Sequence, residues 1–216
     1  PSHNKPERKK LAWDFIRFMC TDRAMQMAAF KTGDAFPVLL VLALRWYVPF
    51  GPLVLYPFTL LATWVHEMGH GLTALLLGGS FQRLLIFPDA SGLAEHTAVP
   101  GLSQVATAAG GLLAPPFLGM ILLAGARRLS RPLILLLAVG IFASLGLWVR
   151  TAIGWLTLAP LGLVLLVLGR YASTELCQFA VRLLGVLLAA DTINGLGYFF
   201  VAAGQVGGRL HPSDIA

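Results

Sequence analysis

Residues 53–77 read LVLYPFTLLATWVHEMGHGLTALLL, an almost continuous apolar run with His66, Glu67 and His70 in its inner half. A helix needs about 20 predominantly apolar residues to cross a bilayer, so this run is long enough to span one. Ionisable side chains inside a membrane helix are energetically costly and usually mark a functional site. The stretch therefore predicts a membrane helix that carries chemistry.

The spacing of the two histidines indicates what that chemistry is. His66 and His70 are four residues apart, which on an α-helix places them on one face, about 6 Å apart along the axis. Both imidazoles can then reach one metal ion, and Glu67 is placed to take a proton from a water bound to it. This is the HExxH arrangement, whose metal is usually zinc. The alternative, that these residues only hold helices together, explains poorly why three ionisable groups lie within five residues.

A catalytic zinc ion takes a third protein ligand and leaves one position open for water. The extended motif with another His six residues after His70 is excluded, because Leu76 stands there. Asp191 is the best candidate, since an acid within the last apolar segment requires a partner. The alternative is that Asp191 lies near a helix end and reaches interfacial water or Arg182. Three further candidates remain open, two in a predicted strand and one in a polar tail: Glu95, His96 and Asp214.

The composition extends the membrane prediction to the whole chain. Of the 216 residues, 57% are hydrophobic and only 12% are charged, whereas soluble globular domains have about 25% charged residues. The mean hydropathy is +0.76. Because so little charge cannot cover the surface of a water-soluble fold of this size, we expect a multi-pass integral membrane protein.

The net charge of +6 does not indicate nucleic-acid binding. Seven of the 16 Lys and Arg residues lie within residues 1–34, and most later Arg residues stand where apolar segments end. No basic stripe is interleaved with stacking aromatic residues, so no nucleic-acid partner is expected. Cys20 and Cys177 are too few for a disulfide framework or a thiolate metal cluster.

The apolar segments predict a mainly α fold, a polytopic bundle of about five to six membrane helices. Segment 36–50 is short and contains Arg45, which favours a tilted or re-entrant helix over a full crossing. Further helices are expected at about 103–125, 132–149, 151–169 and 177–203.

Residues 81–99 differ from the helices around them. Two short β-prone runs flank the turn-rich sequence Pro88-Asp89-Ala90-Ser91-Gly92, which predicts a β-hairpin after the histidine-bearing helix. Unpaired backbone cannot face lipid, so the hairpin is expected at the interface or against protein. Its edge is suited to capturing an extended peptide by β-augmentation, and a purely structural cap over the helix is the alternative.

The stretch HEMGHGLTALLLGG (residues 66–79) resembles the metal-binding helix of the site-2 protease family of intramembrane zinc metalloproteases, most closely the small branch without a PDZ domain. Three further segments are similar to that branch: the β region after Gly78-Gly79, the stretch ATAAGGLLAPPFLGMILLAGARR (residues 106–128) and the closing PSDIA (residues 212–216). The resemblance covers roughly residues 36–216, and only the HExxH block is highly specific.

The resemblance implies a zinc cofactor with His66 and His70 as ligands, Glu67 as general base, and Asp191 as the aspartate ligand of a later membrane helix. Many family members have that aspartate in a Leu-Asp-Gly setting, whereas this chain has Ala-Asp-Thr-Ile-Asn-Gly. Asn194 is then suited to orienting the substrate.

Three parts of the chain follow from this interpretation. Residues 1–34 are a basic segment that favours an amphipathic helix on the membrane surface, with a soluble docked helix as the alternative. Residues 35–205 are an intramembrane metalloprotease-like domain, and residues 206–216 are a polar C-terminal tail.

The expected partners are a membrane-anchored protein substrate and the lipid bilayer, and the expected location is the bacterial inner membrane. Orientation and oligomeric state stay open. Two other functions are weighed against proteolysis: a non-proteolytic zinc-binding membrane scaffold, and a small transporter that relays protons or ions through His66, Glu67 and Asp191.

Overall fold

The computed structural model describes residues 37, 40–41, 43–44, 47–195, 203–206 and 209–212. The chain divides into two units, 1–40 and 41–216, and the description below concerns the second. The surface helix expected within residues 1–34 lies outside the described residues, as does much of the re-entrant segment expected at 36–50.

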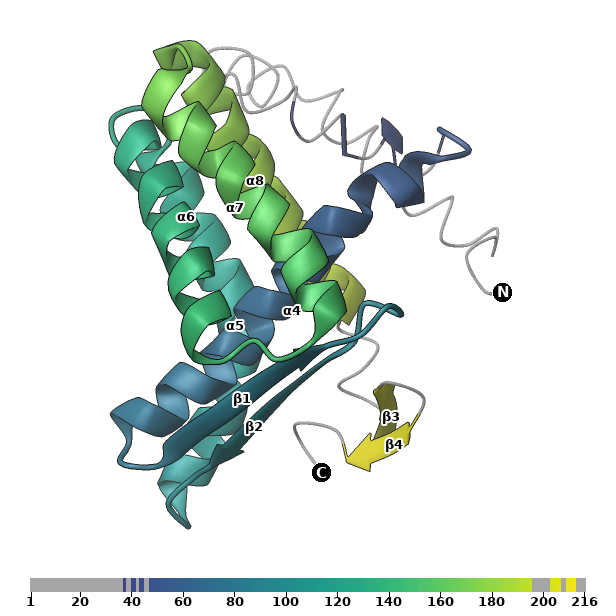
Figure 1. Cartoon of the computed structure of the whole chain (residues 1–216), viewed down its shortest axis with the longest axis vertical. Helices are drawn as coiled ribbons and strands as arrows, with labels where there is room; N and C mark the ends of the chain where they lie inside the picture. Colours follow the sequence, from purple (N-terminus) through teal and green to yellow (C-terminus); the bar gives the residue numbers. More distant parts are fainter. Residues whose placement is uncertain are drawn as a thin grey trace, which may run out of the picture. The chain divides into compact units, whose positions relative to one another are not determined.

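The described part of the chain is mainly helical, which confirms the predicted fold class (Figure 1). The predicted helix boundaries agree with the structure to within three residues, except at the end of the last helix. The helices are α4 (Gly51–Leu76), α5 (Leu102–Gly125), α6 (Ser130–Leu147), α7 (Ala152–Tyr171) and α8 (Thr174–Gly195).

The end of the last helix was predicted wrongly. We expected a helix to residue 203, but Ala203 is the first residue of a strand: Ala203–Val206 (β3) pairs antiparallel with Arg209–Pro212 (β4). Glycines recur from residue 195 onward, and each disfavours a helix by about 1 kcal/mol relative to alanine. The two residues between β3 and β4 are both glycine, a sequence typical of a two-residue hairpin loop.

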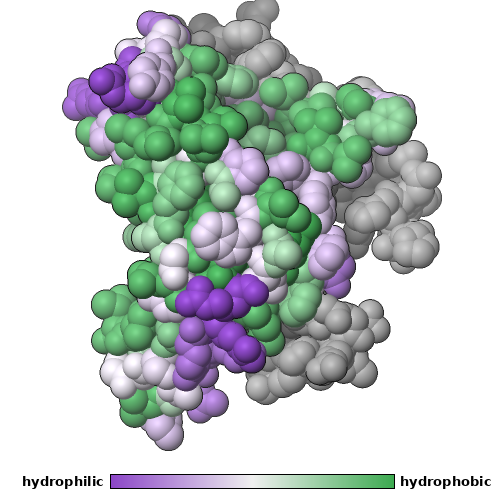
Figure 2. Space-filling model, in the orientation of Figure 1, coloured by the Kyte–Doolittle hydropathy of each residue, from purple (hydrophilic) through white to green (hydrophobic). Residues whose placement is uncertain are grey.

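Three of the described helices, α5, α6 and α7, are long and apolar enough to cross a membrane. Large apolar side chains on these helices are exposed, among them Phe117, Val139 and Leu156. Figure 2 shows broad hydrophobic areas on the face it presents, a surface suited to lipid rather than water. The protein is therefore a membrane protein, and a total of five to six crossings stays a prediction.

The hairpin expected at 81–99 is confirmed. Its strands are β1 (Ser80–Ile86) and β2 (Gly92–Thr97), which pair antiparallel with Leu84 opposite Ala94. In the turn between them Ala90 has a positive φ of 65°. The Asp89 side chain accepts a hydrogen bond from the Ser91 N–H at 3.0 Å, which is the local reason why this sequence turns.

The outer edge of β1 is not free, because the connection between α6 and α7 pairs with it. The Leu84 N–H donates to the Trp148 carbonyl at 2.9 Å, and the Arg150 N–H donates to the Leu84 carbonyl at 3.1 Å. The rings of Phe81 and Trp148 stack with centroids 4.9 Å apart. The hairpin is thus attached to the bundle along β1, and β2 has the outer edge of the hairpin.

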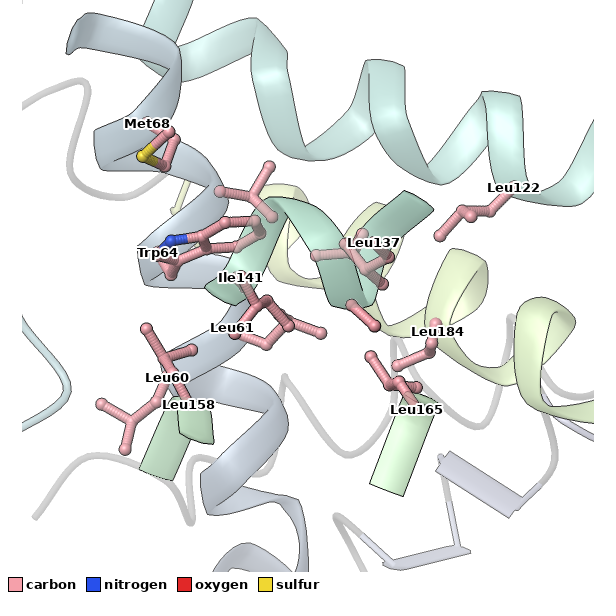
Figure 3. Close-up of a cluster of buried hydrophobic side chains, with 14 of the residues drawn as sticks. Leu60, Leu61, Trp64, Met68, Leu122, Leu137, Ile141, Leu158, Leu165 and Leu184 are labelled. Atoms are coloured by element: carbon pink, nitrogen blue, oxygen red, sulfur yellow. The ribbon is translucent and has the colours of Figure 1, made fainter. Parts of the chain in front are cut away.

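The core lies where the inner face of α4 meets the other helices (Figure 3). Leu60 and Leu61 of α4 are almost completely buried, as are Ile141 of α6 and Leu158 of α7. Trp64 fixes the rotation of α4, because its indole N–H donates to the buried hydroxyl of Ser144 in α6 at 2.8 Å. Since this face of α4 is packed, the following turns of the helix present His66 and His70 to α5 and the hairpin.

Candidate metal centre

The two histidines of the motif converge as their spacing predicts. The Nε2 atoms of His66 and His70 are 3.1 Å apart, and the rings meet edge to face with centroids at 4.8 Å. Two nitrogen ligands of a tetrahedral zinc ion, each at the usual distance of about 2.0–2.1 Å, would lie about 3.3 Å from each other. The pair therefore fits two ligands of one zinc ion.

A backbone carbonyl fixes the tautomer of His70. Its Nδ1 lies 2.9 Å from the carbonyl oxygen of Thr107 in α5, and a carbonyl only accepts, so Nδ1 carries the proton. The lone pair is then on Nε2, the atom that faces His66. Such a second hydrogen bond is the usual way in which proteins orient a metal-binding histidine.

Helix α5 also limits the space around His70. A Cβ added to Gly111 would lie 2.1 Å from His70 Nε2, far inside contact distance. The sequence analysis did not identify this role of Gly111. A glycine pair in a membrane helix is typical of close helix packing in general, and it does not show which side chain the glycines make room for.

The Glu67 carboxylate is buried, with 8% of the residue exposed, and the hairpin holds it. Its Oε2 accepts a hydrogen bond from the Ala94 N–H of β2 at 2.7 Å. Gly92 lies against the same side chain, because a Cβ there would be 2.6 Å from Glu67 Cγ and 2.9 Å from Oε1. Thr63, one turn earlier, donates to the Ala90 carbonyl at 2.7 Å. The hairpin therefore packs against Glu67 and fixes the position of its carboxylate.

Strand β2 separates the two hairpin candidates for the third ligand. Glu95 accepts a hydrogen bond from Arg83 at 2.7 Å, and this bond with the nearby positive charge lowers the pKa of Glu95. The His96 ring instead stacks on His70, with centroids 5.8 Å apart and ring planes 3° from parallel. Adjacent residues of a strand point to opposite faces, so β2 brings His96 to the site and takes Glu95 away from it.

His96 has the same tautomer as His70. Its Nδ1 lies 2.9 Å from the Ala94 carbonyl and must donate to it. Among the side chains that the structure describes, no group of three His, Cys, Asp or Glu is placed to hold a metal ion. The backbone of Asp191 is part of α8, but its side chain and all of Asp214 lie outside the described residues.

The family of the chain follows from comparison with known proteins. No curated protein and no solved structure matched the chain. The model of one family, described as Peptidase M50B-like, matches residues 36–215, a range that includes the histidine pair, Glu67, the hairpin and α8. The chain therefore belongs to the Peptidase M50B-like family, a family of membrane metallopeptidases that are generally zinc-dependent.

Proposed function

We propose that this protein is an intramembrane zinc metalloprotease that hydrolyses peptide bonds of membrane-anchored proteins, as a multi-pass protein of the bacterial inner membrane. The observation that carries the proposal is the convergence of His66 and His70 at 3.1 Å beside a buried glutamate. A zinc ion bound there would lower the pKa of a bound water to about 7 and polarise a peptide carbonyl.

The role of general base falls to Glu67. It directly follows the first histidine, and its burial strengthens every electrostatic interaction that it makes. In the proposed reaction the Glu67 carboxylate accepts the proton of the attacking water and then gives it to the nitrogen of the leaving amine. His70 is held in the correct tautomer throughout by the Thr107 carbonyl.

Asp191 is the proposed third ligand, and the packing of α8 on α5 supports it. A Cβ on Gly119 of α5 would lie 2.9 Å from the Gly185 carbonyl and 3.2 Å from the Ala189 nitrogen, both in α8. Gly185 in turn lies against Leu123. Residue numbers rise along one helix as they fall along the other, so the two helices are antiparallel.

This register takes Asp191 toward the histidines. Asp191 lies two residues beyond Ala189, about 3 Å further along α8. Because the helices are antiparallel, this direction leads toward Gly111, which lies about 12 Å from Gly119 along α5. Gly111 contacts His70, and His66 precedes His70 by about 6 Å along α4. Asp191 therefore lies on the stretch of α8 that runs toward the histidine pair, which supports its role as a ligand.

The outer edge of β2 is the proposed binding site for the substrate backbone. A helical substrate hides its carbonyls in its own hydrogen bonds, so it must become extended before water can attack. Because β1 already pairs with residues 148–150, an extended segment can add to the hairpin along β2. That edge runs past Glu67, which brings the segment to the catalytic groups.

Zinc analysis of the detergent-purified full chain tests the ligand set. We expect near one zinc per wild-type chain, with zinc lost in His66→Ala and Asp191→Ala. Glu175→Gln, at the far end of the same helix as Asp191, is the matched control and should keep its zinc. If Asp191→Ala alone keeps zinc, then Asp191 is not the ligand and His96 and Asp214 come next.

Cleavage of a membrane-anchored reporter tests the reaction. Glu67→Gln should bind zinc at the wild-type level and lose cleavage, because its amide cannot accept the proton. A transporter would lose flux instead, and a scaffold would be unaffected. Cleavage by Glu67→Gln at the wild-type rate would refute the mechanism.

A further inference from the structure

The Ala94 amide points away from the hairpin. Leu84 and Ala94 face each other across the two strands, and the N–H and C=O of Leu84 bond to residues 148 and 150 on the far side of β1. In an antiparallel pair, opposite residues either bond to each other or both point outward. The N–H and C=O of Ala94 therefore face the outer edge of β2.

The N–H and the C=O of Ala94 are each already hydrogen-bonded to a side chain of the site. The Ala94 N–H donates to Glu67 Oε2 at 2.7 Å, and the Ala94 carbonyl accepts from His96 Nδ1 at 2.9 Å. Gly92, the next outward-facing residue of β2, leaves just enough room for the Glu67 side chain. The edge is thus covered by the proposed base and by the histidine stacked on His70.

An added strand and the Glu67 carboxylate cannot share this place. Paired strands lie about 4.8 Å apart, and a carbonyl of an added strand would accept the Ala94 N–H at about 2.9 Å. Glu67 Oε2 already lies at 2.7 Å from that nitrogen, inside the volume that the strand would fill. Strand addition therefore requires the carboxylate to leave the amide.

We infer that Ala94 is a positioning residue whose amide exchanges partners: it holds Glu67 while the edge of β2 is empty, and it binds a carbonyl of an extended polypeptide once one docks. Docking then breaks the hydrogen bond between the Ala94 N–H and Glu67 Oε2 at the moment the scissile peptide arrives. The inference rests on the proposed function, since it takes Glu67 as the general base, and it adds that substrate and base compete for one N–H.

If Glu67 and a peptide compete for the Ala94 N–H, the removal of Glu67 has an effect that it would not have if Glu67 stayed on the amide. Removal of Glu67 should make an extended peptide bind more tightly, because nothing then competes for the Ala94 amide. The probe is a fluorescent, uncharged peptide, acetyl-(Val-Thr)4-amide, whose binding to the detergent-purified full chain is followed by anisotropy. Because the probe is neutral, loss of the Glu67 charge does not by itself change the attraction between peptide and protein.

We expect Glu67→Ala to lower the Kd about tenfold, the range expected when a hydrogen bond to a charged acceptor no longer competes. The Kd of Glu67→Gln should lie between the values for Glu67→Ala and wild type, because the neutral amide oxygen still accepts a weak hydrogen bond from the Ala94 N–H. Ala94→Pro removes the N–H and should abolish binding. Glu95→Gln, on the opposite face of the same strand, is the matched control and should bind like wild type.

Equal or weaker binding by both Glu67 variants would overturn the inference, and so would an absence of binding in every variant. Zinc content and reporter cleavage are measured on the same preparations. If the Glu67 variants bind more tightly but wild type neither holds zinc nor cleaves, the exchange at Ala94 stands and the proposed peptidase fails. If wild type holds zinc and cleaves but the affinities do not change, only the exchange fails.

Discussion

Replacement of Gly111 by alanine tests whether α5 positions His70, a proposed zinc ligand. The added Cβ would lie 2.1 Å from His70 Nε2, 2.3 Å from Cε1 and 2.4 Å from Cδ2. Ordinary contact requires about 3.4 Å or more, since dispersion contacts are optimal at about 3.5–4.0 Å. Either the ring or the helix must therefore move by more than about 1 Å.

A movement of that size exceeds what a metal site tolerates. Ligand distances in metal sites hold within about 0.2 Å, and disturbance of an outer-shell partner alone costs about 10–100-fold in metal affinity. We expect Gly111→Ala to weaken zinc binding at least about 100-fold, beyond an overpacking cost of about 1–3 kcal/mol in stability. Cleavage of the reporter should fall with the zinc content.

Competition against a chromophoric chelator measures the zinc affinity, and circular dichroism verifies that the variant is folded. Gly146→Ala in α6 is the matched control, because a Cβ there has nothing within 4 Å. It should keep wild-type affinity. Wild-type zinc affinity in a folded Gly111→Ala protein would refute the argument that α5 sets the position of His70.

Three further predictions concern the hairpin and the core. Gly92→Ala should displace the Glu67 carboxylate, so that zinc content is kept while reporter cleavage falls at least about tenfold; unchanged cleavage would refute the contact. The pair with Arg83 lowers the pKa of Glu95, so its contribution to stability is present above the usual Glu range and is lost as the pH falls through the lowered pKa. Thermal midpoints of wild type and Glu95→Gln should therefore differ at pH 7 and converge in acid, and a constant difference would contradict the pair. Leu60→Ala, at a completely buried position, should cost about 2–5 kcal/mol in the free energy of unfolding, measured by denaturant titration.

Local sequence patterns predicted much of this molecule. The i, i+4 spacing of His66 and His70 is a property of one helix, so their convergence followed from helical geometry alone. The hairpin was also predictable, because its turn residues lie within one short stretch. The strand that begins at Ala203 was not, since a short apolar run suits a helix or a strand equally well.

The features that orient the site depend on contacts between distant segments. The Thr107 carbonyl lies 37 residues from His70, and the Ala94 N–H lies 27 residues from Glu67. Neither group is a side chain, so no residue type in the sequence marks it. Gly92 and Gly111 are visible as glycines, but only the packed structure shows which atoms they make room for.

The pairing of β1 with the connection between α6 and α7 sets an order for biosynthesis. Leu84 emerges from the ribosome 64 residues before Trp148, which is about 3–13 s of translation. During that interval β1 lacks its outer partner, and the hairpin that holds Glu67 is attached to the bundle on one side only. The hairpin that holds Glu67 is therefore attached along β1 only after α6 and the residues that follow it have been made, so this part of a newly made chain matures late.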